Sequence, residues 1–186
     1  MTTALASAVE LLDRSLAFTR MALVGVGDAG LGARTPCRDW RLRDLLAHMD
    51  DSLDAFTEAA GGKVELTPSR AVPPVLALQQ KACGLLGLWS REGPPGVRVG
   101  GVDLATELLV ATACLEITVH GWDVAQATGA RTRIPDELAR DLLGVARQVV
   151  SDDDRGSRFA TALPEPPGAG PGGRLLAFLG RADRRG

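Results

Sequence analysis

The chain has 186 residues, of which 45% are hydrophobic and 24% charged, so it can bury a sizeable core like an ordinary globular protein. The net charge of −2 and the absence of Tyr give no electrostatic or stacking basis for a nucleic-acid partner. The first apolar stretch carries Glu10, Asp13 and Arg14, which is not typical of a signal peptide, and no apolar run reaches the roughly 18 to 20 residues that span a bilayer. We therefore expect one cytoplasmic domain over residues 1–186, with no membrane partner.

Apolar residues recur with the helical period in five stretches of the chain. The spacing predicts helices over residues 3–24, about 39–60, 73–91, 104–128 and about 135–150. Residues 97–102 are predicted as either a short strand or an extended loop. Residues 151–173 are rich in Pro and Gly and are predicted to be mostly irregular, and residues 174–180 to form one or two helical turns. The fold class predicted from this order is an all-α domain built on four or five helices.

The predicted helix over residues 104–128 is apolar on nearly every side, which is expected of a helix at the centre of a bundle. Glu116 and His120 lie four residues apart in it, so their side chains share one face of the helix. A carboxylate in such apolar surroundings is costly unless a cation or a proton pairs with it. Thr112 and Asp123 lie on the same face, together with small residues that leave room for an ion and a bound molecule.

The chain has only one other histidine, His48, which lies in the predicted helix over residues 39–60. It sits at the shoulder of an apolar stripe and can line a cleft or face the solvent; this helix by itself favours the solvent. If the two helices pack side by side, His48, Glu116 and His120 form a three-ligand metal site. Two imidazoles and a carboxylate with an open fourth position are used for catalytic zinc, although nickel, iron or manganese would also fit.

Two further residue types bear on this site. Asp123 lies one turn beyond His120 and could orient an imidazole, but a cap or a solubilising residue at the helix end is the simpler expectation.

The three cysteines, Cys37, Cys83 and Cys114, are odd in number and widely spaced, so they form neither a disulfide framework nor a metal knuckle. We expect small buried side chains at all three, with Cys37, close to the start of the His48 helix, the one that bears on the site.

Three stretches resemble a known family. Residues 35–40 (TPCRDW) and 43–48 (RDLLAH) resemble the pattern T-P-C-x-x-W-x-x-x-D-L-x-x-H at the start of its second helix. Residues 116–125 (EITVHGWDVA) resemble its E-x-x-x-H-x-W-D-x-A block, and residues 174–181 (RLLAFLGR) the ending of single-domain actinobacterial members. Together they are similar to the DinB-like superfamily, specifically the group related to the N-terminal domain of mycothiol-dependent maleylpyruvate isomerase.

The resemblance implies a four-helix bundle with additional short C-terminal helices that binds a divalent metal, usually zinc, through His48, Glu116 and His120. Characterised relatives use the metal to activate a low-molecular-weight thiol such as mycothiol, and relatives often dimerise. The resemblance therefore implies a thiol-dependent S-transferase or isomerase acting on a small molecule, and it is compatible with a homodimer, although the sequence does not determine the oligomeric state. The isomerase has a further C-terminal domain that contributes to its active site, and this chain ends at Gly186 without one, so maleylpyruvate isomerisation itself is not expected. The alternatives are a non-catalytic metal- or small-molecule-binding module, or a metal-dependent hydrolase or tailoring enzyme of specialised metabolism.

Overall fold

The computed structural model describes residues 3–37, 39–61, 72–91, 96–99, 102–156 and 158–182. These residues form two compact units, which divide between residues 131 and 132. Long helices dominate the first unit and two shorter ones the second, so the predicted all-α fold class is confirmed. The helix ends agree with the sequence predictions to within three residues.

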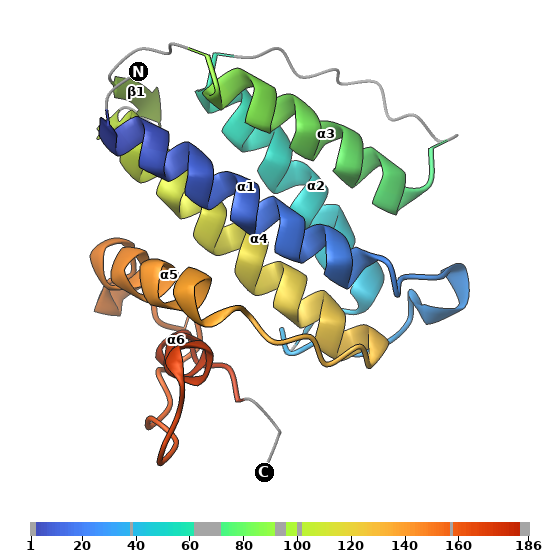
Figure 1. The fold of residues 1–186 in the computed structure, drawn as a ribbon. Helices are drawn as coiled ribbons and strands as arrows, with labels where there is room; N and C mark the ends of the chain where they lie inside the picture. Colours follow the sequence, from blue (N-terminus) through green and yellow to red (C-terminus); the bar gives the residue numbers. More distant parts are fainter. Residues whose placement is uncertain are drawn as a thin grey trace. The chain divides into compact units, whose positions relative to one another are not determined.

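The first unit is a bundle of four helices (Figure 1), namely α1 (Thr3–Leu23), α2 (Leu42–Ala59), α3 (Pro74–Trp89) and α4 (Thr106–Thr128). α1 packs along α4 and α2 along α3, while contacts of α2 with α4 and of α1 with α3 close the bundle. The apolar stripe predicted for α2 faces the core, with Leu42, Leu45, Leu46, Met49 and Leu53 buried. The packing of α2 against α4 matters most for function, because these helices carry the two histidines.

Short elements connect these helices. A turn of 3-10 helix, η1 (Asp28–Gly30), lies between α1 and α2. Strands β1 (Gly96–Val99) and β2 (Val102–Ala105) pair antiparallel just before α4, so the strand alternative is correct for this part of residues 97–102.

α4 is the core helix of the chain. Its length and its mean hydropathy of 1.3 would suit a membrane span, although polar residues interrupt its apolar sequence. However, 78% of that apolar window is buried within the protein, as expected for the central helix of a bundle. The helix ends at Thr128, as predicted, and is followed by Gly129, whose φ of 76° is a left-handed conformation that glycine adopts without strain.

A glycine in α4 allows close contact with α1. The Thr19 hydroxyl on α1 donates a hydrogen bond to the Ile117 carbonyl on α4 at 2.8 Å. A Cβ atom at Gly121 would overlap with the Thr19 hydroxyl oxygen and lie 3.1 Å from the Thr19 Cα. The two backbones can therefore approach this closely only with glycine at position 121, one residue after His120.

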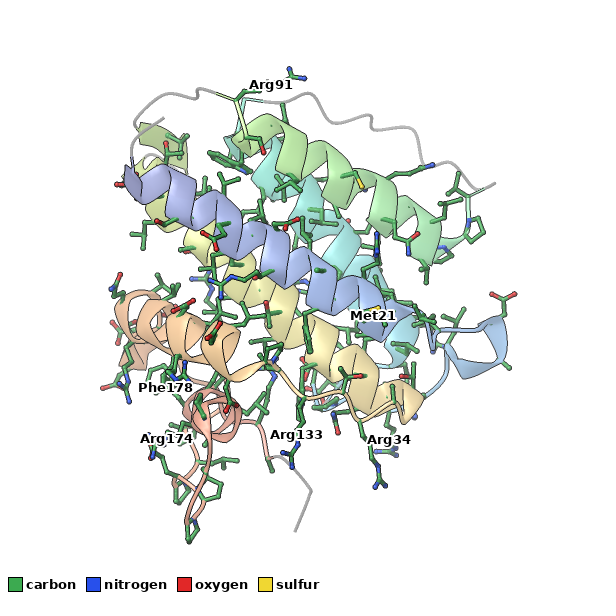
Figure 2. All side chains as sticks on the ribbon, in the orientation of Figure 1. Met21, Arg34, Arg91, Arg133, Arg174 and Phe178 are labelled. Atoms are coloured by element: carbon green, nitrogen blue, oxygen red, sulfur yellow. The ribbon has the colours of Figure 1, made fainter. Side chains whose placement is uncertain are left out.

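The second unit contains α5 (Asp136–Val149), a 3-10 turn η2 (Asp152–Asp154) and α6 (Pro171–Phe178), with α5 packed on α6. The Arg155 guanidinium lies 4.8 Å from the centroid of the Phe178 ring and donates a hydrogen bond to the Phe178 carbonyl at 2.7 Å. Phe178 is labelled in Figure 2. α6 begins three residues before the predicted segment 174–180, because Pro171 can occupy the first turn of a helix.

Candidate metal centre

Two histidines and a glutamate from α2 and α4 converge inside the first unit. Nε2 of His48 lies 2.6 Å from Oε1 of Glu116, and Nε2 of His120 lies 3.0 Å from the same oxygen. The two imidazole rings meet edge to face with centroids 4.9 Å apart. His48 keeps 34% of its side chain exposed, but its Nε2 points at Glu116, so the solvent-facing alternative for His48 is wrong. The three residues proposed from the sequence therefore form one cluster.

Helix geometry and a fixed turn explain this arrangement. Glu116 and His120 meet because they are four residues apart on α4. Before α2, the Thr35 hydroxyl is within hydrogen-bond distance of the Cys37 and Trp40 carbonyls, at 3.0 and 2.9 Å. This turn fixes both residues beside the start of the helix that carries His48.

Trp40 covers the cluster from that turn. Its ring centroid lies 4.6 Å from the ring of His48 and 6.0 Å from that of His120, both in tilted orientations. The indole therefore restricts the rotation of both imidazoles and shields them from water on one side. Sequence analysis did not include Trp40 among the site residues; its place in the T-P-C-x-x-W pattern was the available signal.

A second set of contacts lies on the far side of His120. Its Nδ1 donates to Oδ2 of Asp123 at 3.0 Å, and the Cys37 thiol donates to the same oxygen at 3.3 Å. Asp123 is completely buried, so the expected role as a cap or solubilising residue is wrong. Because Nδ1 donates its hydrogen to Asp123, Nε2 is the nitrogen of His120 that faces Glu116, and it would become a metal ligand once it gives up its own proton.

The remaining sequence candidates lie in different environments. The Thr112 hydroxyl donates to the Leu108 carbonyl of its own helix at 2.8 Å, one turn before Glu116. Cys114 is buried as expected, and burial raises the pKa of its thiol to about 12, which makes it unreactive at neutral pH. The expectation is wrong for Cys83, which is exposed, and for Cys37, which is half-buried. Cys83 lies on α3 and Cys37 in the turn before α2, and both positions are at the edge of the core.

Charge pairing dominates the electrostatics of the cluster. Burial favours the neutral acid, but hydrogen bonds with His120 and His48 outweigh it and hold the pKa of Glu116 well below its usual range. Burial likewise disfavours a charged imidazole, yet contacts with Asp123, Cys37 and Glu116 raise the pKa of His120 well above 6.5. Without a metal, the cluster is thus a half-buried carboxylate neutralised by a protonated imidazole, and an ion would replace that proton.

The donor set fits a divalent metal. The nitrogen and oxygen ligand atoms of His48, Glu116 and His120 all lie within 4.8 Å of one another. Zinc bonds of about 2.0–2.2 Å in a tetrahedron place ligand atoms roughly 3.3–3.5 Å apart, so the Glu116 oxygen would have to move by less than about 1 Å. Cys37, His120 and Asp123 form a second group of suitable spacing, which shares His120 with the first. Oδ2 of Asp123 already accepts hydrogen bonds from His120 and Cys37. We therefore interpret this second group as one that orients His120 and not as a metal site of its own.

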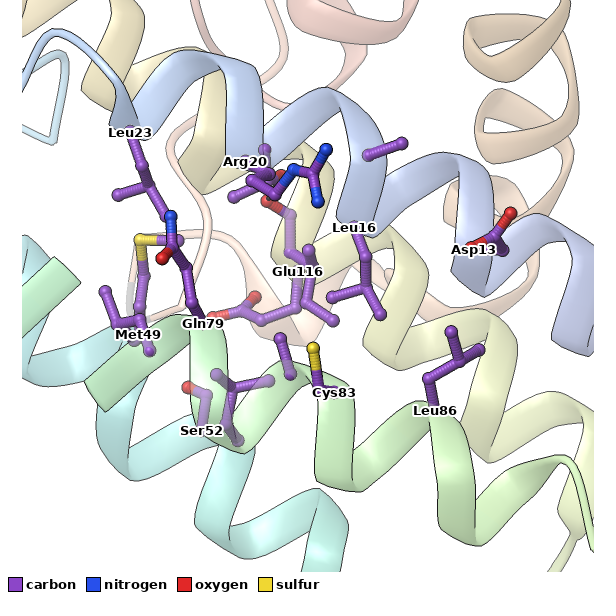
Figure 3. Close-up of a pocket in the computed structure, with 16 residues that line it drawn as sticks. Asp13, Leu16, Arg20, Leu23, Met49, Ser52, Gln79, Cys83, Leu86 and Glu116 are labelled. Carbon is purple, nitrogen blue, oxygen red and sulfur yellow. Dashed lines mark hydrogen bonds between the residues drawn. The ribbon is translucent and has the colours of Figure 1, made fainter. Parts of the chain in front are cut away.

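A cavity of about 450 Å³ opens beside the cluster (Figure 3). Residues of all four bundle helices line it, and Glu116 belongs both to the cavity wall and to the cluster. Ser52 also lines it, with its hydroxyl 3.5 Å from Nε2 of His48. Arg20 on α1 and Gln79 on α3 contribute further polar side chains. Arg20 and Gln79 were not predicted as site residues, because the sequence patterns of α1 and α3 do not show which side chains face a cavity.

Fold and site together define a DinB-like helical bundle with a candidate metal centre of two histidines and a glutamate. The sequence profile of the mycothiol maleylpyruvate isomerase N-terminal domain family matches residues 12–95. Two proteins of Mycobacterium tuberculosis, from different strains and both named as uncharacterised, are 30% identical over 158 residues, which is 83% of this chain and 86% of theirs. The chain belongs to this family. No solved structure matches it significantly.

Proposed function

We propose that this protein is a divalent-metal-dependent enzyme that uses a low-molecular-weight thiol, such as mycothiol, for S-transfer or isomerisation of a small molecule in the cytoplasm. The observation that carries the proposal is the convergence of His48, Glu116 and His120 from two helices next to a cavity. Zinc is the metal we favour, because two imidazoles and a carboxylate leave one position open.

A bound divalent ion would supply the charge that lets a thiol lose its proton near neutral pH. The protein's own contribution is to hold the ligand atoms. Asp123 keeps the hydrogen of His120 on Nδ1, so that Nε2 is available. Trp40 limits water at the two imidazoles, and the cavity beside Glu116 gives the second substrate a place to bind. Family membership supports mycothiol as the thiol.

Metal content tests the site. We expect about one zinc per chain after loading of the wild-type protein, and at most about a tenth of that in His48→Ala and Glu116→Ala, because each variant leaves only two ligands. Asp51→Ala is the matched control, since Asp51 is exposed on α2 near His48. Equal metal content in all four proteins would contradict the proposed centre.

Thiol consumption tests the chemistry. Metal-loaded protein is incubated with mycothiol and a panel of electrophiles, and both the loss of free thiol and the isomerisation of each electrophile are followed, because isomerisation returns the thiol. We expect turnover by the wild-type protein and by Asp51→Ala, and none by His48→Ala. Full metal occupancy without turnover of any electrophile would instead indicate a binding module.

A further inference from the structure

The cavity beside Glu116 has the size of a small-molecule site. Its volume of about 450 Å³ falls within the range of roughly 300–1,000 Å³ that ligand pockets occupy. It lies among all four helices of the bundle (Figure 3), and its walls are mainly aliphatic. The larger apolar side chains include Leu16, Leu23, Met49, Leu53, Leu78 and Ile117. Such walls favour a ligand that loses little hydration on entry.

The charges of the cavity wall also favour an uncharged ligand. Three charged residues line it: Asp13, Arg20 and Glu116. Asp13 and Arg20 are seven residues apart on α1, which separates them by two helical turns or about 10 Å. The charge of Glu116 is already balanced by the imidazoles beside it, and Asp13 and Arg20 carry opposite charges, so the wall has no surplus of positive charge. A ligand with two carboxylates would therefore be desolvated without compensation by the cavity wall.

We propose that this cavity binds a neutral, predominantly apolar small molecule, whose reactive end lies against Glu116. The molecule is the second substrate of the thiol reaction, and this role rests on the proposed function, whereas the binding itself does not. Two polar side chains of the cavity wall would orient the ligand. They are Glu116, which belongs to the metal cluster, and Ser52, whose hydroxyl lies 3.5 Å from Nε2 of His48. Asp13 also lines the cavity and is exposed, so a polar tail directed toward Asp13 would meet solvent.

The probe for this site is N-phenylnaphthylamine, a neutral apolar dye whose fluorescence rises in apolar surroundings. It is titrated into zinc-loaded and metal-free protein, and maleate serves as a small dicarboxylate competitor. We expect the dye to bind both forms with a one-to-one ratio, and maleate not to displace it. This readout is independent of turnover and of metal content, so failure of the cavity proposal is distinguishable from failure of the metal centre.

Variants locate the binding. Ala82→Phe fills the cavity from α3, and Ala77→Phe is the matched control, because Ala77 is also half-buried on α3 but does not line the cavity. Ala17→Phe fills it from an exposed position on α1, where overpacking of the core is not a concern. We expect dye affinity to fall about tenfold or more in both cavity-filling variants and to stay unchanged in the control, since a phenyl ring occupies the space of the ligand.

Three results would overturn the proposal. They are the absence of dye binding to folded wild-type protein, unchanged affinity in a folded Ala17→Phe variant, and displacement of the dye by maleate. Circular dichroism and the unfolding midpoint of each variant establish that it is folded before the dye is added.

Discussion

Asp123 accepts a hydrogen bond from Nδ1 of His120 at 3.0 Å, and its side chain is completely buried. Both residues lie on α4, three positions apart. A buried carboxylate needs partners, and the imidazole N–H supplies one while the Cys37 thiol supplies another. The pair fixes the tautomer of His120 and the direction of its ring, so that Nε2 faces Glu116.

Asp123→Asn weakens this hold on His120 without changing the size of the side chain. We expect zinc affinity to fall about 10- to 100-fold, the usual effect of removing a carboxylate behind a histidine ligand. Competition with a chromophoric chelator measures the affinity. Asp51→Asn, at an exposed position of α2, should leave it unchanged. An unaltered affinity in a folded Asp123→Asn protein would show that the contact does not orient the ligand.

Cys37 acts on the centre through Asp123. Its thiol donates to the same carboxylate oxygen as His120, at 3.3 Å. Cys37→Ala removes the donor and should lower zinc affinity by about threefold to tenfold, because a buried carboxylate loses one hydrogen bond. Cys37→Ser keeps a donor and should restore most of the loss. Equal losses in both variants would indicate that Cys37 contributes only packing.

Gly121 permits the close approach of α1 to α4. Gly121→Ala would press a methyl group against the hydroxyl and Cα of Thr19. We expect the free energy of unfolding to fall by about 1–3 kcal/mol, as is typical of an overpacked core. Gly84→Ala is the control: Gly84 lies within α3 with nothing near its added Cβ, so alanine should stabilise the protein by about 0.5–1 kcal/mol. Urea denaturation compares the two, and similar stability in both would contradict the close contact.

Lys81 on α3 joins two carboxylates of α2, with Nζ 2.6 Å from Asp50 and 2.7 Å from Asp54. Burial opposes its charge, but these hydrogen bonds outweigh burial and raise the pKa of Lys81 above 10.5. A raised pKa in the folded state means that the ion pairs stabilise the protein fully below pH 10.5, and that this contribution is lost as the pH rises through the folded pKa.

The Lys81→Met variant tests this pH dependence. At about pH 8 we expect its free energy of unfolding to be roughly 1–3 kcal/mol below that of the wild-type protein, because two charge-assisted hydrogen bonds are lost. The difference should shrink above pH 10.5, where Lys81 loses its charge in the wild-type protein too. Gln80→Met controls for the added apolar side chain, since Gln80 is exposed on the same helix. A difference that stays constant across this range would exclude the ion pairs as its source.

Features that depend on helical periodicity could be predicted from the amino-acid sequence. It placed Glu116 and His120 on one face of α4, located every long helix to within three residues, and left His48 as the only other histidine. It also predicted the end of α4 at residue 128. All of these follow from the geometry of a single helix, in which residues three or four apart are neighbours.

The orientation of the site residues and the cavity depend on contacts between helices, so they became known only from the three-dimensional structure. It turned His48 toward Glu116, buried Asp123 behind His120 and laid Trp40 over both imidazoles. It also assembled a cavity from four helices, none of which shows the cavity in its own pattern. The period of a helix fixes the directions of its side chains relative to one another. The packing of neighbouring helices then sets whether each side chain faces water, a charged group or a cavity.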